Sequence, residues 1–183
     1  PAATLGYTHN WGLGGMNLFL VLMLVFTVAL MMFVYEPSPT RAYESVLRLQ
    51  RDVRFGQLVR NTHHWSANLL VIVAGLHLLR AFYTGAIHGR RRFNWVIGVF
   101  LFLAILAANF TGYLLPFDQL SYWATTVCTG MLGYLPGVGP WLQSVVRGGD
   151  EIGPRTLTIF YTLHTTSIPV LFALIAPLHF WRV

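Results

Sequence analysis

The sequence predicts an all-α integral membrane domain, a bundle of four transmembrane helices with further helices on the membrane surface. Of the 183 residues, 55% are hydrophobic and only 10% are charged, and the mean hydropathy is +0.58. The apolar residues are gathered into four runs, and each is long enough to cross a bilayer, which takes roughly 20 residues. We therefore treat residues 1–183 as one membrane domain.

The spans are expected at residues 14–35, 61–83, 95–115 and 157–181. The first of them is of full spanning length and has no basic flank, so it does not resemble a cleavable signal peptide. Beyond it, Glu36-Pro37-Ser38-Pro39 ends the helix, because proline cannot continue one. Residues 40–58 then mix apolar and charged positions, which predicts a helix lying along the membrane surface.

The two later connections differ greatly in length. The second is short and contains Arg90-Arg91-Arg92, as in a tight turn between antiparallel spans. The third, residues 116–155, is far longer than most connections, which usually indicates function. Within it we expect interfacial helices at 121–132 and 138–146, separated by Gly and Pro breaks.

The formal charge is +6, and all twelve basic residues are arginines. They lie at helix ends and in loops rather than in a stripe with interleaved aromatic residues, so we expect no nucleic-acid partner. Lipid headgroups or cofactor carboxylates are the expected partners. The single cysteine, Cys128, excludes an internal disulfide, a Cys-rich zinc site and a thiolate-held iron–sulfur cluster.

Four spans place both termini on one side of the membrane. The opposite side has seven arginines and all six acidic residues, and the side of the termini has five arginines. The count of basic residues and the net charge therefore favour different orientations. The compact turn at Arg90–Arg92 favours cytoplasmic termini, in a bacterial inner membrane.

Four of the seven histidines lie inside spans, where ionisable side chains usually face the protein interior or a ligand. His63 and His77 are fourteen residues apart, which leaves them about 40° apart around the helix and about 21 Å apart along it. His164 and His179 are fifteen residues apart, which leaves them about 60° apart around the helix and about 22 Å apart along it. If the two helices face each other, they form two histidine pairs at two depths.

Paired neutral imidazoles suit haem iron, which they ligate on both axial faces. A zinc site needs three or four ligands at one level, and a proton relay needs carboxylates between the histidines. The spans contain neither, so the bundle is expected to enclose two haems.

Other residues are placed to accommodate such a group. Gly98 and Gly112 are also fourteen apart, so a flat macrocycle could lie close to the backbone at two depths, although small residues also serve helix packing. Arg60 and Arg80 lie one turn outside His63 and His77. Each could pair with a propionate or extend to the headgroups.

These residues together resemble the N-terminal half of the cytochrome b/b6 family, from about Gly14 to the C-terminus. The resemblance rests on Arg60-x-x-His63, His77, Arg80, the run Thr111-Gly112-Tyr113-Leu114-Leu115-Pro116-Phe117-Asp118-Gln119, and Tyr122-Trp123. The fifteen-residue gap between His164 and His179, and a chain ending soon after the fourth span, resemble the short, split form of the family.

The resemblance implies two b-type haems, with His63 and His164 on the positive side of the membrane and His77 and His179 on the negative side. It also implies haem contacts at Gly14, Gly98 and Gly112, and a pocket for quinol oxidation lined by Trp123, Ala124, Val127 and Cys128.

Three positions depart from the family pattern. Val28 and Leu24 stand where the family has glycine and glutamine, and Gly12 stands where the split form has the cysteine that anchors an extra haem. We therefore expect no covalent haem. The proline-glutamate motif that completes the quinol site belongs to the C-terminal half, which a partner polypeptide must supply.

The implied function is electron transfer across the membrane within a quinol:cytochrome c or similar oxidoreductase, in which this chain is not catalytically complete alone. Expected partners are a C-terminal-half subunit (subunit IV-like), a Rieske iron–sulfur protein and a c-type cytochrome, in a dimeric complex. One alternative is a dihaem membrane anchor for a quinone-linked dehydrogenase or a respiratory supercomplex without quinol bifurcation. A haem-free transporter or helical scaffold is another.

Overall fold

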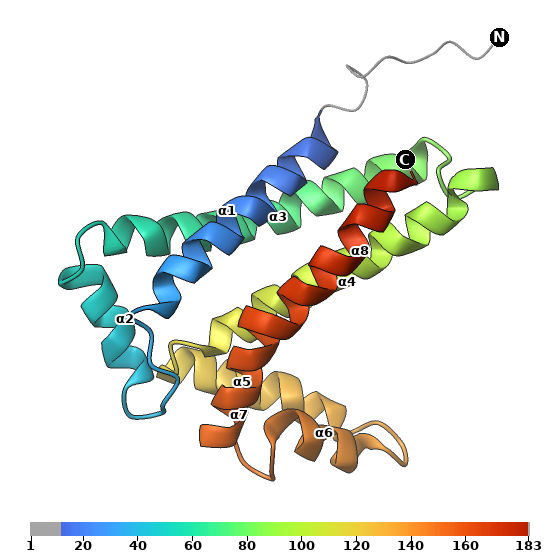
Figure 1. Ribbon diagram of the computed structural model, residues 1–183. Coiled ribbons are helices and arrows are strands. Elements are labelled where there is room, and N and C mark those ends of the chain that lie inside the picture. Colours follow the sequence, from blue (N-terminus) through green and yellow to red (C-terminus); the bar gives the residue numbers. More distant parts are fainter. Residues whose placement is uncertain (1–11, 183) are drawn as a thin grey trace.

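The computed structural model describes residues 12–182, which form helices and connecting turns without a β-strand in that range (Figure 1). Four helical segments are long and apolar enough to cross a membrane: α1 (Leu13–Met32), α3 (Gly56–Tyr83), α4 (Arg92–Leu114) and the segment Pro154–Trp181. At about 1.5 Å per residue, their 20 to 28 residues match a hydrocarbon core about 30 Å thick. The predicted all-α membrane class is confirmed.

The four long helices form two facing halves. Helix α1 packs along α3, and α4 packs along α8 (Ile168–Trp181), while α3 also contacts α4. A small apolar core joins α1, α3 and α4 and consists of Leu13, Leu20, Leu70, Val73, Ala74 and Ile105. The N-terminal end of α1 and the C-terminal end of α8 lie at the same end of the bundle, and the surface helices lie at the other (Figure 1).

The first connection corrects the predicted surface helix at 40–58. The structure has a shorter helix, α2 (Ala42–Arg51), and then a turn after which α3 begins at Gly56, ahead of the predicted start at 61. Phe55 adopts a left-handed conformation with φ 63°. A Cβ at Gly56 would collide with the carbonyl of Leu49, so the chain turns where a residue without a side chain permits close approach.

The third connection contains α5 (Gln119–Leu132) and α6 (Gly139–Arg147). Asp118 caps α5 by accepting a hydrogen bond from the backbone N–H of Ser121 at 2.8 Å. Gly148, with φ 75°, ends α6 in the left-handed conformation that glycine adopts without cost. These two helices and α7 form the end of the molecule farthest from the termini (Figure 1).

The fourth span is not the single regular helix predicted at 157–181. It consists of α7 (Pro154–Thr162), a π-helical turn, η3 (Leu163–Ser167), and α8. Pro169 follows this turn and has no N–H to donate to the carbonyl of Thr165, which favours a local departure from regular α-helix bonding. The π turn contains His164 and therefore affects the site directly.

Candidate dihistidine site

The histidines of α3 meet those of the fourth span at two levels. The ring centroids of His63 and His164 are 6.1 Å apart, and those of His77 and His179 are 6.4 Å apart. The ring planes are steeply inclined in both pairs, at 69° and 79°. The structure thus brings together the four residues that the spacing singled out, one pair toward each end of the bundle.

The pair nearer the surface helices has well-defined hydrogen bonds. The hydroxyl of Thr27 donates to the carbonyl of Met23 at 2.8 Å, so it accepts a hydrogen bond from Nδ1 of His63, also at 2.8 Å. Nδ1 of His164 donates to the carbonyl of Ala108 at 2.9 Å. With the proton on Nδ1, each neutral ring keeps its lone pair on Nε2, which is the arrangement typical of a metal-binding histidine.

The pair nearer the termini lacks such partners. Nδ1 of His77 and Nδ1 of His179 are buried, and neither has a hydrogen-bond partner among the described residues. A buried ring nitrogen without a partner is costly. These two rings are therefore not held by hydrogen bonds at Nδ1 of the kind that fix His63 and His164.

Glycines lie against three of the four rings. A Cβ added to Gly14 would lie 3.6 Å from Cε1 of His77, and one added to Gly98 would lie 3.4 Å from Cε1 of His179. At Gly112 the added atom would lie only 2.5 Å from Cε1 of His164. The sequence suggested that glycines at these positions make room for a flat macrocycle. In the structure, the nearest neighbour of each is a histidine ring.

The π turn removes the mismatch between the two histidine spacings. On regular helices a fourteen-residue spacing leaves the second side chain about 40° short of the first, and a fifteen-residue spacing leaves it about 60° beyond, a difference in rotation of about 100°. A π turn takes one residue more than an α-helical turn. The segment Leu163–Ser167 therefore absorbs the extra residue, and His164 and His179 face α3 much as His63 and His77 face the fourth span.

One large cavity, of about 1710 Å³, separates the two halves of the bundle and is lined by all four histidines. It exceeds the roughly 300–1,000 Å³ of a typical single-ligand pocket, so it has room for more than one large group. Arg60 and Arg80 line it as well, together with residues that sequence reasoning had not selected: Arg91, Asn94, Trp95, Tyr113 and Arg182.

The histidine pairs fit a haem. An imidazole nitrogen binds a metal ion at about 2.0 Å, so two rings that ligate one ion from opposite sides have centroids about 6 Å apart. Both pairs have that separation, and the cavity between the helices is apolar with arginines near its ends. No group of three or more His, Cys, Asp or Glu suited to a metal ion occurs among the described residues.

The residues expected at the quinol pocket lie outside the large cavity. Trp123 and Val127 are 59% and 61% exposed on the outer face of α5, Cys128 is exposed, and Ala124 is half-buried. None of the four lines the large cavity; Val127 lines a separate depression of about 560 Å³. Asp118, Leu120 and Ser121, at the start of α5, do line the large cavity.

Sequence reasoning missed Thr27, Ala108 and Thr111. Thr27 and Ala108 bond the rings of His63 and His164, and the hydroxyl of Thr111 lies 3.4 Å from Nδ1 of His164. Only Thr111 could have been selected from the sequence, since it begins the Thr-Gly-Tyr motif. The other two contacts join different helices, which a single-sequence pattern does not indicate.

The four apolar spanning helices and the two facing histidine pairs fit the class of membrane cytochromes. The model of the cytochrome b/b6/petB family matches residues 4–183. Cytochrome b6 of Heliomicrobium gestii is 40% identical over 168 residues, 92% of this chain and 79% of that protein. Cytochrome b6 of Prochlorococcus marinus (strain NATL1A) is also 40% identical, over 171 residues, 93% of this chain and 78% of that protein.

A chain of the solved structure titled "Hyperthermophilic respiratory Complex III" has the same fold, with a TM-score of 0.89 and 24% sequence identity. The match covers 100% of this chain and 48% of that one, so the present chain spans about half of its length. The chain belongs to the cytochrome b/b6 family. It is an integral membrane protein of a haem-binding, electron-transporting family.

Proposed function

We propose that this chain is the dihaem, electron-transferring half of a quinol-oxidising complex of the bc type. His63 and His164 hold one b-type haem on the positive side of the membrane, and His77 and His179 hold the other on the negative side. The observation that supports this most strongly is the pair of facing imidazole couples, 6.1 and 6.4 Å between centroids, at two depths of one cavity.

Haem iron, when bound, supplies reversible one-electron transfer, and the chain supplies position and polarity. Thr27 and the carbonyl of Ala108 hold the positive-side rings in the tautomer that leaves Nε2 free. Arg60 and Arg80 line the cavity one turn beyond His63 and His77, in position to bind propionates. Gly12 offers no thiol, so no covalent haem is proposed.

Quinol is oxidised, in this proposal, on the side of the surface helices, next to α5, with Trp123, Ala124, Val127 and Cys128 lining the pocket. Quinone is reduced on the side of the termini. The exposed positions of Trp123 and Val127 agree with a pocket whose other wall comes from a C-terminal-half polypeptide. The remaining partners are a Rieske protein and a c-type cytochrome, in a dimeric complex of a bacterial inner membrane with cytoplasmic termini.

A redox-titrated optical spectrum of the purified complex, with haem quantified per chain, tests the assignment. We expect two b-type haems of separable midpoint potential. Replacing His164 with Leu should remove the positive-side component alone, and replacing His179 with Leu the negative-side component alone. Replacing the exposed His64 with Leu is the control and should remove neither. One haem or none in the unmodified chain would refute the proposal.

A second candidate is a dihaem anchor without quinol bifurcation. Two observations favour it: Leu24 and Val28 replace family residues on α1, and the proposed pocket residues of α5 do not line the histidine cavity. Inhibitors of the quinol oxidation pocket distinguish the two candidates. A quinol-oxidising complex is inhibited by them, whereas an anchor continues to pass electrons in their presence.

A further inference from the structure

Arg147, the last residue of α6, is a buried cation that the proposed electron path does not use. It is 9% exposed. Its Nε donates to Oγ1 of Thr129 at 2.8 Å, its Nη2 to the carbonyl of Thr126 at 3.0 Å, and its Nη1 to the carbonyl of Asp150 at 3.1 Å. With its amide oxygen turned toward the guanidinium, Gln143 accepts from Nη1 and Nη2 at 2.8 and 3.0 Å. All five N–H donors of the guanidinium are thus engaged.

Every acceptor around this guanidinium is neutral. The ion pairs within residues 12–182 join Glu36 to Arg41 and Arg48, and none includes Arg147. An arginine does not deprotonate in a protein, so the charge remains. Burying a charge without a counter-charge is costly, so the hydrogen bonds that surround Arg147 must offset that cost.

Arg147 also connects α5 to the helix that carries His164. Its carbonyl accepts a buried hydrogen bond from Oγ1 of Thr156 in α7 at 2.6 Å, and α7 leads directly into the π turn. On the other side, Thr129 lies on the buried face of α5, whereas Trp123 and Val127 lie on its exposed face. Arg147 therefore forms hydrogen bonds with both α5 and α7.

We propose that Arg147 is a positioning residue for quinol oxidation: it holds the exposed face of α5, with Trp123 and Val127, at a set distance from the helix of His164. The inference rests on the proposed function and names a residue that its chemistry requires. A misplacement of about 1 Å at a reacting site can cost about 100-fold in rate. A planar guanidinium with five fixed donors sets direction and register together, which an ammonium cannot do.

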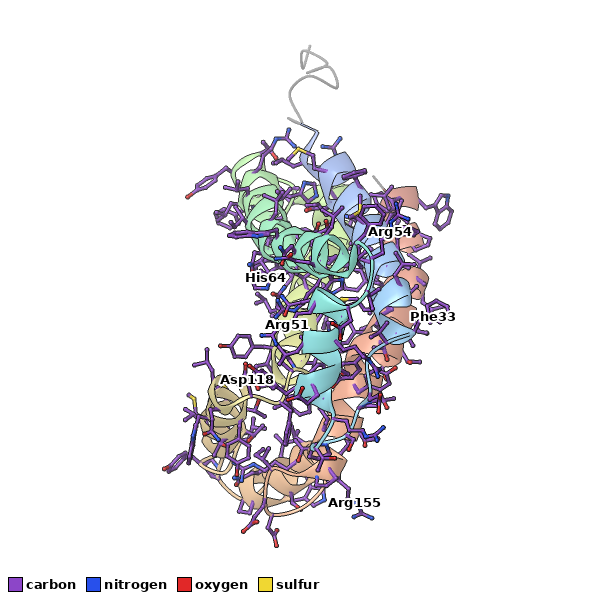
Figure 2. All side chains as sticks on the ribbon, turned by 90° about the vertical axis from the view of Figure 1, so that its left-hand side faces the viewer. Phe33, Arg51, Arg54, His64, Asp118 and Arg155 are labelled. Carbon is purple, nitrogen blue, oxygen red and sulfur yellow. The ribbon has the colours of Figure 1, made fainter. Side chains whose placement is uncertain are left out.

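The test uses the assembled complex with Arg147→Gln, Arg147→Lys and Thr129→Val. Arg155→Gln is the matched control, since Arg155 is an exposed arginine of the neighbouring helix, α7, at the end farthest from the termini (Figure 2). We expect kcat/KM for quinol to fall about 10- to 100-fold in Arg147→Gln and less in Thr129→Val. Arg147→Lys should restore it only in part, and Arg155→Gln should match the unmodified complex.

A second readout separates positioning from folding. The haem content and the reduction of the haems from the quinone side should be unchanged in Arg147→Gln and in Thr129→Val. Unchanged quinol kinetics in both variants would overturn the role of Arg147 and leave the proposed function of the chain intact. Loss of haem in step with quinol oxidation in both variants would also overturn it, by showing a purely structural role. An unmodified dihaem complex that does not oxidise quinol would overturn the proposed function, and this inference with it.

Discussion

At the scale of single residues, Gly112 shows how little space the site leaves. Its missing Cβ would lie 2.5 Å from Cε1, 3.0 Å from Nδ1 and 3.1 Å from Nε2 of His164, so an added methyl group would contact the whole edge of the ring. The ring is itself held by the carbonyl of Ala108, which belongs to the same helix as Gly112. A displacement of the imidazole away from Gly112 would therefore strain that hydrogen bond.

We expect Gly112→Ala to displace the His164 ring and weaken haem binding at the positive-side pair by about 10- to 100-fold, a typical effect of disturbing the surroundings of a metal ligand. The matched control is Gly15→Ala, because nothing lies within 4 Å of a Cβ at Gly15. Haem per chain and the two midpoint potentials are the measurements. Equal haem content and equal potentials in the two variants would contradict the prediction.

Glu36 provides a residue-scale prediction outside the membrane spans. Its carboxylate accepts from Nη1 of Arg41 at 2.9 Å and from Nη2 of Arg48 at 3.0 Å. The hydrogen bond from Arg41 is the main cause that lowers the pKa of Glu36 below its usual 4.5; desolvation opposes the shift, and Arg48 reinforces it. A lowered pKa in the folded state means that these contacts stabilise the protein above the unfolded-state pKa.

That stabilisation should be lost as the pH falls through the folded-state pKa, below 4.5. We expect Glu36→Gln to loosen the connection between α1 and α2 at neutral pH and to differ little from the unmodified chain in acid. Limited proteolysis of residues 33–41 against pH measures this. Glu44→Gln is the control, since Glu44 is exposed and forms no ion pair among the described residues. A pH-independent difference would contradict the assignment.

At the scale of elements, the π turn in the fourth span decides whether two histidines with an odd spacing share a face. It spans Leu163–Ser167, and Pro169 follows it. Because it takes up one residue, the remaining helix presents His164 and His179 to α3 as a fourteen-residue spacing would.

Deleting Thr166 should therefore convert the π turn to regular α-helix and preserve both histidine pairs. Inserting one alanine after Ala173 should rotate His179 by about 100° away from His77 and remove the negative-side haem. Haem content and the optical spectrum of each variant are the readouts. A deletion variant that loses a haem while the insertion variant keeps both would refute this account of the turn.

The surface helices also owe their positions to specific contacts. The Glu36 ion pairs join α2 to the end of α1, and the hydroxyl of Tyr35 donates to the carbonyl of Leu115 at 2.6 Å, linking the end of α1 to the end of α4. Composition predicted that α2 lies on the surface. It did not predict where α2 ends, because the turn depends on the approach of Gly56 to Leu49.

At the scale of the whole molecule, much of the periphery is apolar. Large side chains are exposed around the bundle, among them Phe19, Leu22, Phe26, Phe100 and Leu174, and Phe33 projects from the edge of the bundle (Figure 2). A bilayer solvates such a surface, so the outward apolar face costs nothing there.

A bundle built around so large a cavity should depend on what fills it. We expect the chain assembled with haem to unfold at a markedly higher temperature than chain produced under haem depletion. A group that binds only the folded state, at a concentration about 1,000 times its Kd, raises the free energy of unfolding by about 4 kcal/mol. Thermal unfolding of both preparations in one detergent is the measurement. Equal midpoints would show that the cavity does not hold a stabilising cofactor.

Much of this architecture could be predicted from the sequence. Four apolar runs predicted the four spans, because hydrocarbon thickness sets their length. The histidine spacings predicted two levels, because a helix repeats a face at known intervals. The pocket residues of α5 remain a prediction, since three of them, Trp123, Val127 and Cys128, are exposed and none lines the large cavity.

The sequence by itself determined which helices span the membrane, which faces carry the histidines, and to which family the chain belongs, because these depend on composition and periodicity along one chain. Only the tertiary structure decided the partners of the rings, Thr27 and Ala108, the contact of Gly112 with His164, and the five hydrogen bonds of Arg147. The physical reason is that these contacts, apart from the bonds of Arg147 to the nearby Gln143 and Asp150, join segments far apart in the sequence. Their geometry exists only after the helices have packed.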